Sequence, residues 1–229
     1  MTMQFYVSPE QQMKDRADFA RKGIARGRAV VVMRYSGGIC FVAENPSATL
    51  HKISELYDRI GFAAVGRYNE FEALRIAGIQ QADVRGYTYD RSDVTGRSLA
   101  NSYAQVMGGV FASVAEKPFE VELVVAEVGI TPEADQIFRI SYDGTVSDES
   151  GYTAVGGHAE SISGRLAESF EPTADLSTAV RTAVAALAGE PGPAVTELEV
   201  ACLDRTRAQG RKFVRLSDQR IRELLGASS

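Results

Sequence analysis

The sequence predicts an α+β fold in which two β-sheets lie face to face and helices cover their outer sides. The first observation is the stretch from Gly27 to Gly66, which holds four apolar runs in succession. The second is the order that follows, because pairs of helices alternating with runs of strands are typical of stacked layers. The third is size, since 229 residues of which 45% are hydrophobic can bury the core of one such domain.

The N-terminal element is a predicted helix over residues 8–26. Ser8 suits the N-cap, Pro9 suits the first helical position, and Gly27 can end the helix. Only a weak, alanine-rich apolar stripe recurs at helical spacing. We therefore expect this helix to pack against a neighbouring chain as much as against its own core.

Four predicted strands follow the helix. A Ser36-Gly37-Gly38 turn joins the first two strands as a β-hairpin. Asn45-Pro46 ends the second strand, because proline has no N–H to donate to a ladder. Both faces of the four strands are largely apolar, so we expect one sheet that is covered on each side. The strands are predicted at 29–33, 39–43, 52–56 and 60–65.

Two helices are expected after the fourth strand, over residues 69–82 and 95–115. A polar connection that carries tyrosines, residues 85–93, separates them. An apolar stripe at helical spacing predicts which face of the second helix packs on the sheet. This stripe consists of Leu99, Tyr103, Val106, Val110 and Val114.

The C-terminal half adds more strands and three more helices. Asp143-Gly144 is a hairpin turn signal, and Gly156-Gly157 leads into a helix. Asp175 caps a helix that Gly189 ends, and Ser217 caps the last short helix. The predicted strands are 120–128, 136–142, 145–147, 152–155, 198–203 and 212–216, and the helix capped by Asp175 covers 176–187.

Composition and charge limit the class of protein. The formal net charge is -5 and the pI is about 5.2, so we expect no nucleic-acid partner. No apolar run approaches the ~20 residues that span a bilayer, and residues 1–6 lack the pattern of a signal peptide. Cys40 and Cys202 each lie in an apolar strand, which predicts buried thiols. A soluble, cytoplasmic protein with no membrane partner fits these features.

Few residues suggest chemistry of their own. His51 and His158 have no cysteine or carboxylate at ligand spacing, so we expect no metal and no cofactor. The turn before His158 lacks the Lys-Ser/Thr ending of a phosphate loop. Thr2 would become an N-terminal nucleophile if Met1 were removed, but it precedes a long helix and is better interpreted as a tail residue.

Several segments resemble the α subunits of the proteasome, and among these the actinobacterial kind. The resemblance extends over nearly the whole chain. It implies the four-layer αββα sandwich of the Ntn-hydrolase and proteasome subunit fold, which agrees with the order of elements. The segments that carry it are residues 8–9, 19–27, 41–47, 52–59, 68–71 and 89–97.

This resemblance implies a subunit that is not catalytic. The related β subunits expose a threonine at the start of the first strand, with an acid and a lysine beside it. Here that start is near Arg28, which has no nucleophilic hydroxyl. Glu44 and Lys52 lie near where the acid and the lysine would fall, so the frame of an active site is expected without its nucleophile.

The resemblance also assigns a docking pocket, a gate and an inner constriction. The pocket for the C-terminal carboxylate of an activator tail involves Lys52, Gly27, Gly66 and Arg67. The gate consists of Thr2, Met3, Gln4, Phe5, Tyr6, Val7, Ser8 and Pro9. The inner constriction involves Lys117 and Phe119, and Glu120 stands where relatives usually have glycine.

The implied organisation is a single proteasome α-type domain over 1–229, with a gating tail (1–7), an N-terminal helix (8–26) and the sandwich (27–229). Its expected partners are other α subunits in a homo-heptameric ring, proteasome β subunits, an ATPase ring activator that docks through its C-terminal tails, and unfolded protein substrates, commonly tagged with a ubiquitin-like modifier. Two rival interpretations are a threonine hydrolase and a stand-alone binding module.

Overall fold

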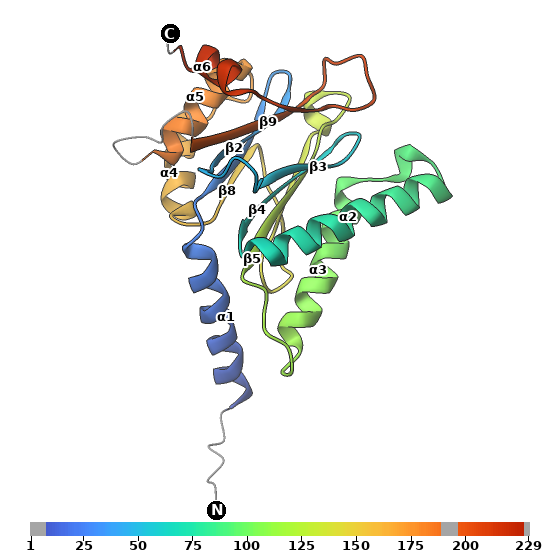
Figure 1. The fold of residues 1–229 in the computed structure, drawn as a ribbon, viewed down its shortest axis with the longest axis vertical. Coiled ribbons are helices and arrows are strands. Elements are labelled where there is room, and N and C mark those ends of the chain that lie inside the picture. The colour runs from blue at the N-terminus through green and yellow to red at the C-terminus, as the bar shows by residue number, and fades with distance from the viewer. Residues whose placement is uncertain (1–7, 189–196, 227–229) are drawn as a thin grey trace, which may run out of the picture.

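The computed structural model describes residues 8–188 and 197–226 (Figure 1). Within these ranges the helices are α1 (Pro9–Ala25), α2 (Tyr68–Thr88), α3 (Gly96–Ala112), α4 (Ala159–Ser169), α5 (Leu176–Leu187) and α6 (Asp218–Leu225), with short 3-10 helices at Arg91–Asp93 and Pro132–Ala134. The strands are β1 (Val30–Tyr35), β2 (Gly38–Glu44), β3 (Ile53–Tyr57), β4 (Ile60–Gly66), β5 (Val121–Glu127), β6 (Gln136–Ile140), β7 (Val146–Asp148), β8 (Tyr152–Val155), β9 (Leu198–Asp204) and β10 (Phe213–Arg215).

The described strands build two antiparallel sheets of five strands each. The first sheet has the order β10-β9-β2-β1-β8, and the second sheet has the order β3-β4-β5-β6-β7. Helices α4, α5 and α6 pack on the outer side of the first sheet, and α2 and α3 pack on the outer side of the second (Figure 1). The expected α+β fold with four layers is confirmed.

The prediction that the first four strands form one sheet is wrong. β1 and β2 pair as the expected hairpin in the first sheet, whereas β3 and β4 pair in the second sheet. The other edge of β2 is taken by β9, which pairs with it from Gly38↔Asp204 to Glu44↔Leu198. Residues 45–52 therefore carry the chain from one sheet to the other. Both faces of each hairpin are apolar because each sheet has the other sheet on one side and helices on the other.

The two helices on the second sheet also differ from expectation. α2 continues to Thr88, through part of the predicted connection. Contacts from distant residues hold this extension: Arg85 Nε donates to the Asp93 carbonyl at 2.9 Å, and Gly86 packs on the Tyr57 hydroxyl. α3 was predicted over residues 95–115, but it begins at Gly96, with Thr95 as its N-cap, and ends at Ala112.

The packed face of α3 is rotated from the predicted stripe. Leu99 and Tyr103 are buried as expected, but Val106 is 50% exposed and Val114, beyond the helix end, is 78% exposed. Ala100 and Met107 are buried instead. The stripe was built from large apolar residues, whereas the face that contacts the sheet includes a small residue that allows close approach.

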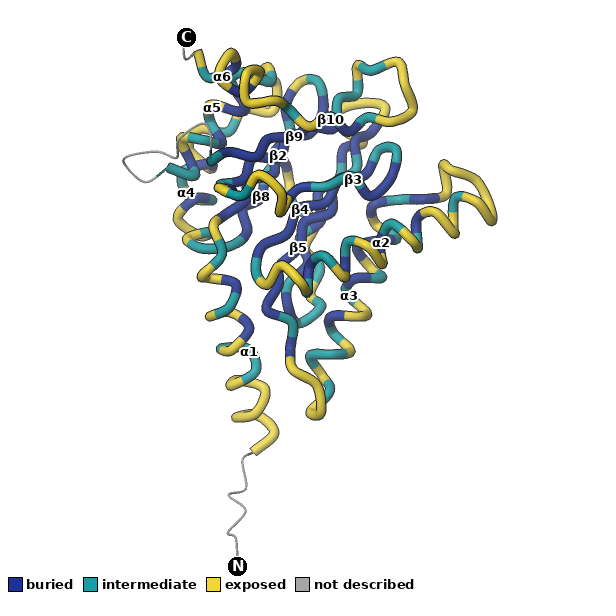
Figure 2. Tube along the Cα trace, viewed as in Figure 1, coloured by how far each residue is buried: buried dark blue, intermediate teal, exposed yellow. Residues whose placement is uncertain are grey.

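Buried apolar residues form three main layers, and the buried parts of the chain are dark blue in Figure 2. The layer between the sheets includes Val32, Phe41 and Val124, and the other two lie between each sheet and its helices. Cys40 and Cys202 are buried and lie opposite each other across the β2–β9 pair. Burial raises the pKa of the Cys40 thiol and raises that of Cys202 to about 11. The prediction of buried thiols is confirmed.

Helix α1 extends away from the sandwich (Figure 1). As predicted, Ser8 caps it by accepting a hydrogen bond from the Gln11 N–H at 3.2 Å, and Pro9 is its first residue. The helix buries only Ala20 and Ile24 against its own chain. None of the described helices is long and apolar enough to cross a membrane. Gly189, the predicted end of α5, lies outside the described residues.

Candidate functional site

The head of β1 is where the chain segments before β1 and β3 meet the end of β2. The Lys52 ammonium donates hydrogen bonds to the carbonyl oxygens of Arg28, at 2.7 Å, and Glu44, at 3.0 Å. Arg28 Nη1 in turn pairs with Glu44 Oε1 at 2.6 Å. The three residues that the sequence placed in an active-site frame are therefore in contact. The residue at the head of the strand is an arginine in mid-chain, so this frame contains no nucleophile.

The surroundings of Lys52 change the pKa of its ammonium group. Burial lowers the pKa of Lys52 to about 8, Glu44 and Glu199 oppose this shift, and Arg28 adds to it. An ammonium has three N–H donors, and the two carbonyl bonds use two of them. The arrangement leaves one donor for an incoming acceptor such as a carboxylate.

Glu199 is a functional candidate that the sequence interpretation missed. It lies on β9, is 8% exposed, and accepts a hydrogen bond from the Lys52 main-chain N–H at 2.9 Å. A second bond comes from the Asn45 side chain at 2.8 Å. The sequence did contain a signal for this residue, since Glu199 is a carboxylate inside the otherwise apolar run Leu198–Leu203. A charge buried in a strand needs hydrogen-bond or ion-pair partners, so it marks a place where other polar groups gather.

The two glycines of the predicted pocket, Gly27 and Gly66, lie against each other. A Cβ on Gly27 would come within 2.4 Å of Val65 Cγ1 and 3.3 Å of the Gly66 nitrogen. Gly66 has φ of +122°, and a Cβ there would lie 1.9 Å from the Glu120 carbonyl oxygen. A new side chain would collide with the Val65 side chain at Gly27 and with the Glu120 carbonyl at Gly66, so both positions favour glycine. Since Gly27 adjoins Arg28, the glycines lie beside the Lys52 contacts.

Arg67 and Lys117 meet at Glu120, although the sequence assigned them to different sites. Glu120 Oε1 lies 3.2 Å from Arg67 Nε and 3.0 Å from Lys117 Nζ. Lys117 also pairs with Glu70, and its ammonium lies 5.6 Å from the centre of the Phe19 ring. Phe119 is partly buried and packs against the core between the second sheet and its helices. This cluster joins the predicted pocket to the predicted constriction segment.

The gate residues Thr2 to Val7 lie outside the described residues. Ser8 and Pro9 form the first turn of α1. His158 caps α4 with φ of 61°, in the turn between β8 and that helix, and His51 Nδ1 lies 3.3 Å from Glu199 Oε1. Within the described ranges, no group of three His, Cys, Asp or Glu residues is placed to hold a metal ion.

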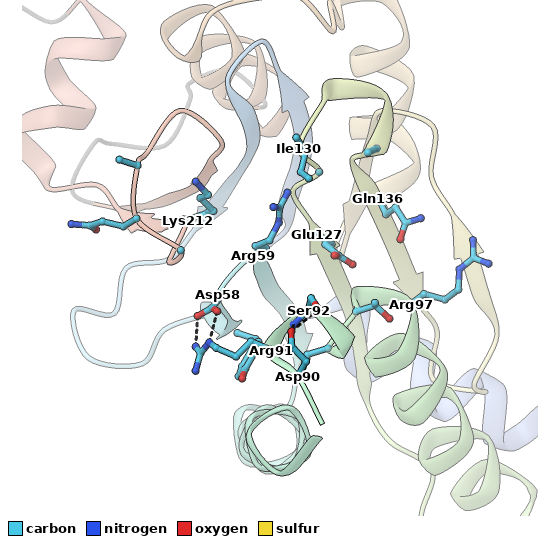
Figure 3. A pocket seen from close by; sticks show the side chains of 18 residues that line it. Asp58, Arg59, Asp90, Arg91, Ser92, Arg97, Glu127, Ile130, Gln136 and Lys212 are labelled. Carbon is cyan, nitrogen blue, oxygen red and sulfur yellow. Dashed lines mark hydrogen bonds and ion pairs between the residues drawn. The ribbon is translucent and has the colours of Figure 1, made fainter. Parts of the chain in front are cut away.

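A hollow of about 840 Å³ lies elsewhere on the molecule and contains none of the predicted site residues (Figure 3). Its charged groups are largely committed to contacts within the chain. Arg91 forms a two-pronged pair with Asp58 at 2.8 and 2.6 Å, and Arg59 donates to the Val128 carbonyl. Glu127 accepts from the Gly96 N–H at 2.7 Å. These contacts hold the surrounding turns and the start of α3 together.

Comparison with known proteins adds independent findings. A family model described as "Proteasome subunit" matches residues 24–189. Three similar relatives are each named "Proteasome subunit alpha". That of Nocardioides sp. is 60% identical over 99% of this chain and 90% of its own length. That of Streptomyces griseus is 58% identical over 98% and 85%. That of Acidothermus cellulolyticus is 57% identical over the full length of both chains.

Proposed function

The chain belongs to the proteasome subunit family and is a non-catalytic α subunit, and from this premise we propose that it forms the gated outer rings of a core particle. It assembles with other proteasome subunits, so the interpretations as a threonine hydrolase and as a stand-alone binding module are wrong. We propose that its ring is homo-heptameric, that it stacks on a ring of β subunits, and that the particle works in the cytoplasm. The proposed domain is single, with a gating tail at 1–7, a helix at 8–26 and the sandwich at 27–229.

The contact of Lys52 with the Arg28 carbonyl is the single observation that carries the proposed mechanism. In this contact the lysine of the frame is bonded to the main chain at the place where a nucleophile would stand. Its role is therefore not to activate a hydroxyl. A half-buried ammonium with a remaining donor is suited to bind an anion.

We propose that the anion is the C-terminal carboxylate of an activator tail from an ATPase ring. A charge-assisted hydrogen bond to a carboxylate is about twice as strong as a neutral one. Gly27 and Gly66 lie against each other, and Gly27 precedes Arg28, whose carbonyl accepts from Lys52, so we propose their main chain as part of the pocket. Arg67, whose side chain is more exposed than that of Glu120, adds a second cation at the rim.

The proposed route for substrate passes the N-terminus of α1. Thr2 to Val7, with Ser8 and Pro9 as their anchor on the helix, would restrict entry of unfolded proteins, commonly ones tagged with a ubiquitin-like modifier. Lys117 and Phe119 would line the inner constriction. The cluster around Glu120 supports a link between the constriction segment and the docking pocket, because Glu120 contacts both Lys117 and Arg67.

The test is Lys52→Ala in the assembled particle, with ATPase-stimulated degradation of an unfolded protein as the measurement. Stimulation should fall strongly while assembly with β subunits is retained. Lys212→Ala is the matched control, because Lys212 also donates to two carbonyls, those of Arg205 and Arg207, but lies outside the pocket. Equal stimulation in the Lys52 and Lys212 variants would exclude the pocket assignment.

A further inference from the structure

Glu199 places a negative charge in the layer between the two sheets. Along β9 it shares a face with Ala201 and Leu203, which belong to the buried apolar layer between the sheets. A carboxylate in such surroundings is costly unless charge and hydrogen bonds compensate it. Glu199 should therefore have several hydrogen-bond and ion-pair partners. The identity of these partners shows which part of the chain Glu199 holds in place.

Most of these partners come from the segment that joins β2 to β3. The Lys52 N–H donates to Glu199 at 2.9 Å and the Ile53 N–H at 3.2 Å. The Asn45 side-chain amide donates at 2.8 Å, and His51 Nδ1 lies 3.3 Å from the carboxylate. One side chain of the first sheet thus holds both ends of the segment that crosses to the second sheet.

Asn45 extends this hold through the middle of the segment. Its Nδ2 also donates to the Leu50 carbonyl at 2.8 Å, and its Oδ1 accepts from the Ser47 N–H at 3.1 Å. Asn45 is buried and its own N–H donates to the Glu197 carbonyl at 2.6 Å. The path of the chain up to Lys52 is therefore fixed by side-chain bonds and not by a sheet ladder.

Arg215 completes the arrangement from β10. It forms an ion pair with Glu199, and its Nη2 donates to the Ile53 carbonyl at 2.6 Å. Both main-chain polar groups of Ile53 are then bonded to side chains of the first sheet. This residue directly follows Lys52, so the backbone of Lys52 is fixed on both sides.

We propose that Glu199 is the positioning residue of the Lys52 pocket, and that with Asn45 and Arg215 it aims the Lys52 ammonium at the carboxylate of a docking tail. The inference rests on the proposed function, because it assigns Glu199 to the pocket in which that function places Lys52. Glu199 itself is buried and touches the backbone of Lys52, so it acts through Lys52 and does not contact the tail.

The same geometry gives Glu199 a second effect on Lys52. The charged groups that face the ammonium are Glu44 at the end of β2, Glu199 on β9 and Arg28 before β1. Glu199 favours the charged form of Lys52, and so its removal should move the loss of that charge to lower pH. A merely structural residue would not shift this titration.

The experiment is Glu199→Gln in the particle assembled with β subunits. The probe is a short peptide with the C-terminal sequence of an actinobacterial ring ATPase, with a free carboxylate, and its C-terminal amide is the control ligand. We expect affinity for the free-carboxylate peptide to fall about tenfold or more, as for a lost hydrogen bond to a charged group. We also expect the alkaline loss of binding to begin at lower pH. Unchanged affinity together with an unchanged pH profile overturns the proposal.

A second variant tests whether Glu199→Gln loses binding only because the protein no longer folds. Glu199→Gln combined with Arg215→Gln leaves no unpaired charge in the interior, and we expect the same loss of affinity. The control variant is Glu55→Gln, which breaks an exposed ion pair between β3 and Arg211 and should leave binding unchanged.

Lys52→Ala distinguishes a failure of the proposed function from a failure of the role assigned to Glu199. If that variant binds the peptide as the unmodified particle does, both the proposed function and the role of Glu199 are wrong. If Lys52→Ala loses binding while both Glu199 variants retain it with the original pH profile, only the role of Glu199 is wrong.

Discussion

Gly23 of α1 lies directly against the buried side chain of Glu120. A Cβ on Gly23 would come within 2.2 Å of Glu120 Oε2 and 2.7 Å of its Cβ. Glu120 is only 7% exposed and is held by Arg67 and Lys117, so it has little freedom to retreat. The N-terminal helix therefore lies so close to Glu120, the residue before β5, that only glycine fits at position 23.

Gly23→Ala should accordingly destabilise the protein by about 1–3 kcal/mol, the usual cost of overpacking. The measurement is thermal unfolding of the assembled particle and of the isolated chain. Gly164→Ala is the control, because Gly164 lies on the exposed side of α4 with nothing near a new Cβ. There the change should stabilise the helix by up to about 1 kcal/mol. Equal effects at the two positions would contradict the contact.

Binding of an activator tail should weaken as pH rises through about 8. Burial lowers the pKa of Lys52 to about 8, so the ammonium is charged below this pH and loses its proton above it. A bound carboxylate favours the charged form, so a saturating tail should move the transition to higher pH. The measurement is tail affinity across the neutral and alkaline range.

Lys52→Arg provides the control for this pH dependence. A guanidinium stays charged across the range, although its shape differs from that of an ammonium and should weaken binding at every pH. The alkaline loss of binding should disappear in this variant. If the same loss persists, a group other than Lys52 is responsible for it.

Deleting Thr2 to Val7 should speed the degradation of unfolded proteins in the absence of an activator. The deletion stops before Ser8, whose hydroxyl caps α1, and so the helix should remain intact. The measurement compares an unfolded protein with a short peptide, since a gate restricts the larger substrate more. A tail of equal length built from glycine and serine separates the effect of length from that of side chains. No acceleration after deletion would mean that these residues do not restrict entry.

The purified chain should show no peptide hydrolysis on its own. Activity should appear only after it is mixed with its β partner, and it should elute with an assembled barrel on a sizing column. The physical reason is the arginine at the head of β1, which offers no hydroxyl. Hydrolysis by the chain alone, unaffected by replacing Arg28, would require a nucleophile elsewhere and would direct attention to Thr2.

Local signals predicted most of the element boundaries. Asp175 and Ser217 each cap the helix that they were expected to cap, with hydrogen bonds to Thr178 and Arg220. The β1–β2 hairpin also forms as predicted, because a two-residue turn fixes its register. Each of these features depends on residues a few positions apart, so a single sequence contains the necessary information.

Features that depend on distant pairing could not be predicted in the same way. The division of four strands between two sheets follows from β9 pairing with β2, more than 150 residues along the chain. The site shows the same limit. Lys52 was identified by its resemblance to a family, whereas the role of Glu199 required the packing of β9 against the segment before β3. The meeting of Arg67 and Lys117 at Glu120 was likewise visible only in three dimensions.

One arginine of α1 connects this helix to the C-terminal end of α3. Arg16 donates to the carbonyls of Val110 and Phe111 at the end of α3, at 2.8 and 3.0 Å, and to the Glu116 carbonyl at 2.8 Å. Val110 and Phe111 lie in the last turn of α3, where carbonyls lack the usual helical donors, and the Val110 carbonyl also accepts from the Ser113 N–H at 3.2 Å. A force that pulls on the N-terminus would therefore pass through Arg16 to α3 and to the segment before Lys117. If a substrate protein pulled on the N-terminus as it entered, the force would reach α3 before it reached the sheets.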